Sequence, residues 1–228
     1  MKIEIEDSEN IWAPISDLMA GLMMVFILIA ISYMVKSRSA AKVYNDTQQK
    51  LVEKLQIEFE DDLESWNAKI IDSTLSIQFL SNEKTTGSIE NILFKRGKDN
   101  ITPFFKKNLD SVFPKFLKIV HSEEFKFIID EIRVEGHTSS IGQKNNGDDS
   151  YFYNMGLSQR RSKNVLEYCF GYADSNQKEW LRKKATANGL SYSKRIVKPN
   201  GEENFESSRR VEFRIKTNSE SALKRVLN

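Results

Sequence analysis

The hydrophobic residues of this chain change their spacing along its length, and the first stretch is almost continuously apolar. From Ile15 to Val35 the apolar run is broken by one charged residue, Asp17. At about 1.5 Å per helical residue the run spans roughly 30 Å, which matches the hydrocarbon core of a bilayer. The pattern therefore predicts a transmembrane helix over residues 11–35, preceded by a short acidic tail at residues 1–10.

A different spacing follows in residues 36–72. Residues 38–70 contain no Pro or Gly, and their large apolar residues recur at steps of three or four, at Leu51, Leu55, Phe59, Leu63, Trp66 and Ile70. This period is typical of an amphipathic helix, so we expect a helical linker. Its apolar stripe is suited to packing against a partner or against the following domain, and a dimer-forming stalk is the alternative.

From Thr74 onward the pattern alternates between strand-like and helix-like segments. Thr102-Pro103 is typical of a helix start, with Thr as the N-cap and Pro at the first helical position. In chain order the expected elements are strands at 75–79 and 91–94, a helix from 103 towards 121, a strand at 127–134, a turn-rich loop at 145–150, helices at 157–170 and 176–184, and a strand at 210–216. The mixture predicts an α+β domain over residues 73–217, followed by a C-terminal tail at 218–228.

Composition narrows the function classes. With 34 basic and 32 acidic residues the net charge is +2, which gives no support to nucleic-acid binding. The single cysteine, Cys169, excludes a disulfide within the chain and is expected to be a buried small hydrophobe rather than a bridge to another chain. His121 and His137 lack metal-ligand spacing, and no catalytic triad or carboxylate pair stands out. We therefore expect neither an enzyme nor a metal or cofactor.

The apolar run is expected to remain in the protein as a membrane anchor. It is longer than the apolar region of a secretory signal peptide, contains an acid, and lacks a small-x-small cleavage site directly after it. Lys36, Arg38 and Lys42 follow the run, whereas residues 1–10 are mainly acidic. The positive-inside rule alone would therefore place the C-terminal side in the cytoplasm.

An acid within a membrane helix points to function. A charged residue at mid-helix costs about 2.5–3.5 kcal/mol on insertion scales, and such residues commonly serve as ion or proton sites. At helical spacing Asp17 shares a face with Ala20 and Gly21, two small residues that would let a second helix approach closely. The alternative is that Asp17 lies at the membrane rim among lipid headgroups.

One segment of this helix resembles a known family. Asp17-Leu18-Met19-Ala20-Gly21-Leu22-Met23-Met24-Val25-Phe26, with Trp12 upstream, is similar to the membrane helix of MotB-type stator subunits. The segment Ser16-Asp17-Leu18-Met19 and the paired methionines are most similar to the corresponding helix in the B subunits of Zorya anti-phage defence systems. The resemblance implies an ion-driven rotary motor in which Asp17 carries the ion, with H⁺ as the expected ion and Na⁺ as the alternative. It also implies a homodimer of this chain inside a ring of MotA-like or ZorA-like A subunits.

Three further motifs resemble the OmpA-like peptidoglycan-binding domain. In chain order they are Gly136-His137-Thr138-Ser139, Tyr153-Asn154-x-x-Leu157-Ser158-x-x-Arg161, and Arg209-Arg210-Val211-Glu212. The resemblance implies that the peptide stems of the cell wall are bound by Thr138, Ser139, Tyr153, Asn154, Leu157 and Arg161. The planar guanidinium of arginine fits a carboxylate, so Arg161 is expected to bind a carboxylate of the stem peptide. The alternative is that Arg161 forms an ion pair inside the domain.

The chain departs from this family pattern where the ligand would be held. Ser139 stands where the family has an Asp, so the usual acceptor for a ligand ammonium group is missing. Ser162 and Ser208 likewise replace the Ala and Asn of the pattern. Wall binding is therefore expected to be weaker, or to be tuned to another stem peptide.

Together the two resemblances predict the B subunit of a proton-driven motor complex that is anchored to peptidoglycan and is most like the Zorya type. They imply the bacterial inner membrane, with the N-terminus in the cytoplasm and the C-terminal domain in the periplasm, against the positive-inside rule. A flagellar stator subunit and a wall anchor that transports no ion are the two alternatives. A direct contact with nucleic acid is not expected.

Overall fold

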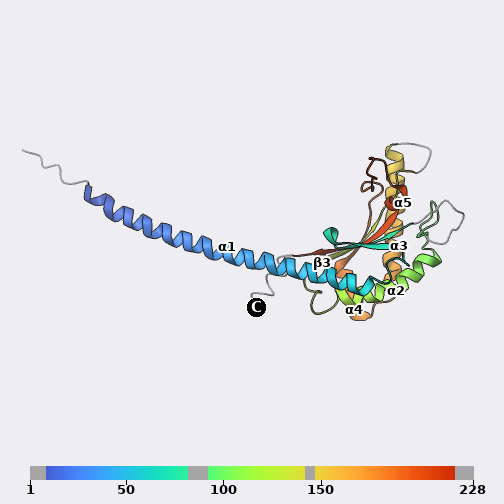
Figure 1. Cartoon of the computed structure of the whole chain (residues 1–228), viewed down its shortest axis with the longest axis horizontal. Coiled ribbons are helices and arrows are strands. Elements are labelled where there is room, and N and C mark those ends of the chain that lie inside the picture. Colours follow the sequence, from blue (N-terminus) through green and yellow to red (C-terminus); the bar gives the residue numbers. More distant parts are fainter. Residues whose placement is uncertain (1–8, 82–91, 142–146, 219–228) are drawn as a thin grey trace, which may run out of the picture.

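The computed structural model describes residues 9–81, 92–141 and 147–218. One long helix leads into a folded domain built on a twisted sheet (Figure 1). This helix, α1, extends over Glu9–Phe59 and contains 51 residues, so it is about 77 Å long. Most of the expected tails, at 1–10 and 218–228, lie outside the described residues.

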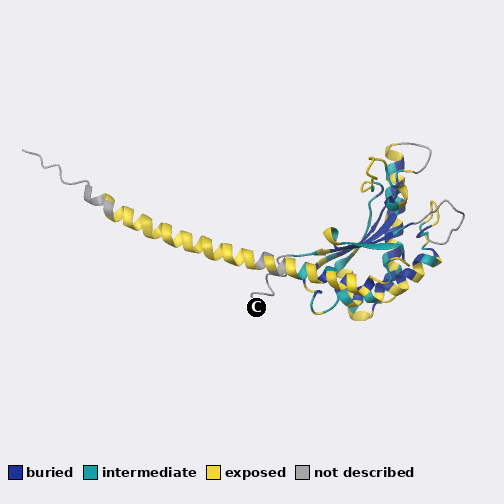
Figure 2. Cartoon of the chain, in the orientation of Figure 1, coloured by how far each residue is buried: buried dark blue, intermediate teal, exposed yellow. Residues whose placement is uncertain are grey.

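Helix α1 combines the predicted membrane helix and the first part of the predicted linker. Its segment Pro14–Ser39 is long and apolar enough to cross a membrane. The side chains of this segment are exposed, whereas Leu51, Leu55 and Phe59 are fully buried (Figure 2). Because these three residues recur every four positions, one face of the helix packs into the domain core. The apolar stripe of the linker is therefore part of the domain.

The helix ends at Phe59, so the prediction of a helix through residue 70 is wrong over its last turns. The backbone turns at Asn67, which has a φ of 50°, and strand β1 follows at Ala68–Ile71. β1 pairs antiparallel with β2, Ser76–Leu80, and this ladder is favoured over continued helix. The folded domain thus begins before residue 73.

Five strands form one sheet in the order β1-β2-β5-β3-β4. The remaining strands are β3 at Ile129–Gly136, β4 at Ala185–Gly189 and β5 at Arg210–Thr217. β3 and β4 are parallel, and the other neighbours are antiparallel. The helices of the domain are α2 at Pro103–Val120, α3 at Asp148–Phe170, α4 at Ser175–Lys184 and α5 at Phe205–Ser208, with a 3-10 turn η1 at Asp72–Thr74. The architecture is α+β, as predicted.

Helix α2 confirms the predicted helix start. The Thr102 hydroxyl accepts a hydrogen bond from the Phe105 amide at 3.2 Å, and Pro103 is the first helical residue. Pro114 lies inside the helix without ending it. All the apolar residues that follow the helical period from Phe105 to Leu117 are buried, at Phe105, Leu109, Phe113, Phe116 and Leu117. The ring of Phe105 packs against Phe79 of β2. The rings of Phe113 and Phe116 pack against Phe213 of β5.

The two faces of the sheet differ in polarity. Val134 of β3 is paired with Phe213 of β5, and both are buried on the face that carries the helices. The opposite face presents charged pairs, with Glu135 opposite Glu212 and Arg133 opposite Arg214. Successive side chains of a strand point to opposite faces of the sheet, so Val134 lies in the apolar core whereas Glu135 lies on the polar face.

Several predicted boundaries shift in the structure. The helix expected at 157–170 begins earlier, at Asp148, so the end of the expected loop at 145–150 is helical, and Asn145 and Asn146 lie outside the described residues. The strand expected at 91–94 is reduced to one bridge between Phe94 and Ile101, and Asn91 lies outside the described residues. β3 extends over Ile129–Gly136, two residues later at each end than the expected strand at 127–134. Cys169 is fully buried, as expected.

Candidate ligand-binding pocket

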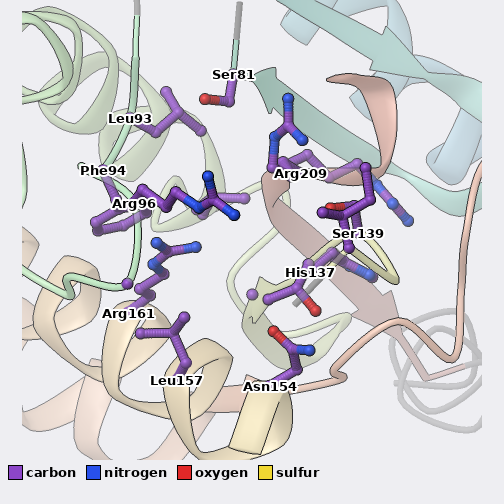
Figure 3. A pocket seen from close by; sticks show the side chains of 16 residues that line it. Ser81, Leu93, Phe94, Arg96, His137, Ser139, Asn154, Leu157, Arg161 and Arg209 are labelled. Carbon is purple, nitrogen blue, oxygen red and sulfur yellow. The ribbon is translucent and has the colours of Figure 1, made fainter. Parts of the chain in front are cut away.

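A pocket of about 280 Å³ lies where the end of β3, the start of β5 and helix α3 meet the loop around residues 93–97 (Figure 3). It is lined by Ser81, Leu93, Phe94, Arg96, Gly97, Gly136, His137, Thr138, Ser139, Ile141, Asn154, Leu157, Arg161, Arg209, Arg210 and Val211. Five of the six residues proposed from the sequence as wall ligands are among them, namely Thr138, Ser139, Asn154, Leu157 and Arg161. The three separated motifs therefore converge on one cavity.

Close packing of β3 against α3 positions the first motif. A Cβ added to Gly136 would lie 2.4 Å from the backbone oxygen of Ser158, so only glycine lets the strand approach the helix this closely. The amide of Thr138 then donates to the Ser191 carbonyl at 2.8 Å. Thr138 and Ser139 are both buried, and the Thr138 hydroxyl has no hydrogen-bond partner within the described residues. That hydroxyl is available to a ligand.

Helix α3 supplies the opposite wall of the pocket. Asn154 is buried and its amide group donates to the Ser150 carbonyl at 3.0 Å, one helical turn back. Leu157 lies one turn further along the same helix face and adds an apolar surface. Figure 3 shows both side chains directed towards the cavity. The wall thus combines an oriented amide with an apolar patch.

Arg161 is tied to the loop that closes the pocket. Its Nε donates to the Lys98 carbonyl at 2.8 Å and its Nη2 donates to the Lys95 carbonyl at 3.2 Å. Its guanidinium also lies 4.8 Å from the centre of the Phe94 ring, within cation–π range. Arg161 therefore braces this loop, a role that motif resemblance did not indicate. By contrast, Arg160 is exposed and pairs with Asp99 at 2.9 Å.

Tyr153 lies outside the lining of the cavity. Its ring is partly exposed, and its hydroxyl would be 3.7 Å from a Cβ added to Gly97. It therefore borders the turn at the rim of the pocket. Arg96 and Arg209 are two of the pocket residues to which the sequence motifs assign no ligand role. Arg209 stands inside a quoted motif, whereas Arg96 has no sequence signal beyond its place beside Gly97 in a polar turn.

A buried polar network lies beside the pocket. The His137 Nε2 is 3.7 Å from a Glu135 oxygen and 3.5 Å from a Glu212 oxygen. The same Glu212 oxygen accepts hydrogen bonds from Arg210 at 2.6 Å and from Gln78 at 2.9 Å. These carboxylates and the imidazole are close enough to be considered as metal ligands. The guanidinium on Glu212 instead favours a network of ion pairs, because it already balances that charge.

Burial sets the protonation preferences in this network. Burial lowers the pKa of His137, and the charge of Arg210 adds to this effect, so that together they outweigh the two carboxylates. Burial alone would raise the pKa of Glu135, but His137 and the nearby guanidiniums of Arg214 and Arg133 hold that pKa below its usual value. The folded domain therefore favours a neutral imidazole beside a charged carboxylate.

These pKa shifts predict that acidification destabilises the domain. Because folding favours neutral His137, the unfolded chain binds the proton more readily, and stability is lost as the pH falls below the ordinary histidine value of 6.5. The contribution of Glu135 is lost only as the pH falls below its ordinary value of 4.5. Thermal unfolding midpoints should therefore decrease between about pH 7.5 and about pH 5.5 in the wild type.

His137→Gln removes the imidazole that titrates and should flatten this decrease. His121→Gln is the matched control, because His121 packs edge-on against Trp180 away from the network. An equal decrease in the wild type and in His137→Gln would contradict the assignment.

The membrane-length segment holds the second candidate site. Asp17 lies near the start of Pro14–Ser39 and is exposed on the helix surface. Next to it along the helix, a Cβ added to Gly21 would meet no other atom within 4 Å. The surface beside Asp17 is therefore open to a neighbouring helix.

Comparison with known proteins assigns this chain to a family. Residues 93–209 match the OmpA family model. A Zorya protein ZorB from Escherichia coli (strain Crooks) is 36% identical over 97% of this chain and 94% of its own length. A Zorya protein ZorB from another Escherichia coli strain is 25% identical over 92% of this chain and 81% of its own length.

Solved structures of lower similarity were also found. A MotB-like protein from Desulfovibrio vulgaris is 18% identical, with a TM-score of 0.46 over 79% of this chain and 96% of its own. The cell wall anchor of the T6SS from Pseudomonas aeruginosa is 17% identical, with a TM-score of 0.46 over 72% of this chain and 97% of its own. The sequence relationships carry the assignment: the chain belongs to the ZorB family of Zorya proteins, and its residues 93–209 belong to the OmpA family.

Proposed function

We propose that this chain is the B subunit of a proton-driven membrane motor in a Zorya anti-phage defence system. The observation that carries the proposal is the length of the relationship to ZorB, which covers 97% of the chain. Such a relationship includes both the helix that contains Asp17 and the domain that contains the pocket. A wall-binding domain alone would not require an acid in its membrane helix.

Asp17 is the proposed proton carrier. Its carboxylate would take up a proton from one side of the membrane and release it towards the other, in contact with a ring of A subunits. Moving one charge through 100 mV is worth about 2.3 kcal/mol, which sets the energy of each step. This energy is comparable with the cost of about 2.5–3.5 kcal/mol for a charged residue at mid-helix, so protonation and movement can be coupled.

The pocket domain is the proposed anchor. In the periplasm it would bind peptide stems of peptidoglycan through Thr138, Ser139, Asn154, Leu157 and Arg161, with Tyr153 at the rim. The N-terminus would then lie in the cytoplasm and the chain would cross the inner membrane once. Arginine, hydroxyl and amide groups around a half-apolar cavity suit a peptide that ends in a carboxylate.

Helix α1 connects the two sites without a break. From Ser39, the end of the membrane-length segment, to the buried Leu51 there are 12 residues, or about 18 Å of helix. Lys54 pairs with Glu124 at 2.8 Å, and Gln56 donates to Asp72 at 3.1 Å, so polar contacts flank the buried stripe. A continuous, docked helix would hold the membrane segment firmly against the anchored domain.

The proposal includes a homodimer through the face of α1 that carries Gly21. Gly21→Leu fills the open space beside Asp17, so it should weaken the dimer and remove phage protection. The measurement is cross-linking of the detergent-solubilised full chain, together with phage protection in cells. Ala30→Leu is the matched control, because position 30 lies on the opposite face of the helix. Normal cross-linking and protection in Gly21→Leu would refute this interface.

A further inference from the structure

The turn at residues 95–98 is built to present one side chain. Its amide at Lys98 donates to the Lys95 carbonyl at 3.0 Å, and Gly97 has a φ of 68°, a conformation that other residues rarely adopt. The Phe94–Ile101 bridge closes the base of the loop. Arg161 of α3 donates hydrogen bonds to the Lys95 and Lys98 carbonyls and so fixes both ends of the turn. The residue at the tip of this braced turn is Arg96.

Arg96 extends from the turn into the pocket. Its side chain lines the cavity, and Figure 3 shows its guanidinium reaching between Arg161 and Arg209. The residue as a whole is exposed, so a ligand can reach it from solvent. Among the described residues that line the pocket, four are arginines and none carries a carboxylate, and one of the four, Arg210, is paired with Glu212 beside the pocket. Clustered guanidiniums repel one another, and an anion in the cavity relieves that repulsion.

The guanidinium donors of Arg161 are already bonded within the fold. Arg161 is nine-tenths buried and directs Nε and Nη2 to backbone carbonyls. Those two groups are engaged in the fold, which reduces the fork that Arg161 can offer to a ligand. Elsewhere in the pocket lining, the buried Thr138 hydroxyl has no partner within the described residues. A carboxylate-bearing ligand in this cavity would pair with Arg96 and would offer the Thr138 hydroxyl a partner.

We propose that Arg96 directly binds a carboxylate of the wall peptide and that Arg161 is a positioning residue that holds the turn from which Arg96 projects. This assignment rests on the proposed anchoring function and names the cation that recognises the ligand. Charge-assisted bidentate pairing is the strongest contact that such a site can make, so Arg96 should contribute a large share of the affinity. The turn supplies the orientation and Arg96 supplies the charge.

The test changes the arginine and the ligand carboxylates together. Detergent-solubilised full-length chain is sedimented with purified peptidoglycan, either native or with its carboxyl groups converted to amides. The wild type should prefer native peptidoglycan. Arg96→Ala should bind native peptidoglycan about tenfold more weakly and should lose the preference over the amidated form. Arg96→Lys keeps the charge without the fork and should retain an intermediate affinity.

Arg160→Ala is the matched control, because Arg160 is an exposed arginine of α3 outside the pocket lining. It should bind as the wild type does, and the unfolding midpoint of Arg96→Ala should also be unchanged. If the wild type sediments with native peptidoglycan and Arg96→Ala binds equally well, or keeps the full preference over the amidated form, the Arg96 assignment is overturned. If the wild type does not sediment with native peptidoglycan, the anchoring function fails as well.

Discussion

Asp17→Asn is expected to abolish phage protection while the protein still reaches the membrane and assembles with its A subunit. Asparagine keeps the shape and most of the hydrogen bonding of the side chain, but it cannot take up and release a proton. Asp17 is exposed on α1 and, in the chain by itself, its surroundings on the Gly21 side are open. The substitution therefore removes the titrating group without disturbing packing within the chain. Protection is measured by phage plating at matched membrane levels of the protein.

Two further variants make this comparison specific. Asp17→Glu keeps a titrating group one methylene further out, so partial protection is expected. Asp46→Asn changes an exposed acid of the same helix beyond Pro14–Ser39 and should protect normally. If Asp17 only anchors the helix at the membrane rim, the neutral Asn is easier to bury and full protection follows. Loss of motility in place of phage protection would instead indicate a flagellar stator subunit.

Arg161→Ala should have the largest effect on wall binding, because it removes both a pocket residue and the brace of the 95–98 turn. Two charge-assisted hydrogen bonds and the contact with the Phe94 ring are lost. Losing these contacts at a nearly buried site should reduce the free energy of unfolding by about 2–4 kcal/mol. Sedimentation of the full chain with peptidoglycan should fall below detection at temperatures where the domain is still folded.

Stability measured beside binding separates the roles of the two arginines. Arg161→Ala should change both quantities, whereas Arg96→Ala should change binding alone. Asn154→Ala removes the oriented amide of α3 and is expected to weaken binding. Unchanged sedimentation of Arg161→Ala would contradict both roles of Arg161, as a pocket residue and as the support of the 95–98 turn.

The sequence was informative where a pattern has one structural meaning. Twenty-one mostly apolar residues are enough to span a bilayer as one helix, and a Thr-Pro pair before an apolar period is typical of a helix start. Strands with alternating apolar residues, such as β2 and β5, were also predictable. The family motifs located five of the six expected ligand residues in one pocket, because the family pattern depends on the geometry of that pocket.

Other elements depend on contacts that no local pattern encodes. β4 has the sequence Ala-Thr-Ala-Asn-Gly and forms only because it can pair in parallel with β3. β1 continued a helical period in the sequence, yet its pairing with β2 prevails. Arg96 enters the pocket because a distant side chain, Arg161, holds its turn. Tertiary contacts of this kind explain why the brace role of Arg161 was not predicted.

The most direct test of the account is proton entry into cells that carry both subunits and are exposed to phage. Cytoplasmic pH is followed in cells with wild-type protein and in cells with Asp17→Asn at equal membrane levels. A proton-driven motor with Asp17 as its carrier predicts acidification on phage exposure in the wild type and no such change in Asp17→Asn. Equal acidification in both, or phage protection by the wild type without any proton entry, would contradict a proton-driven motor with Asp17 as its carrier.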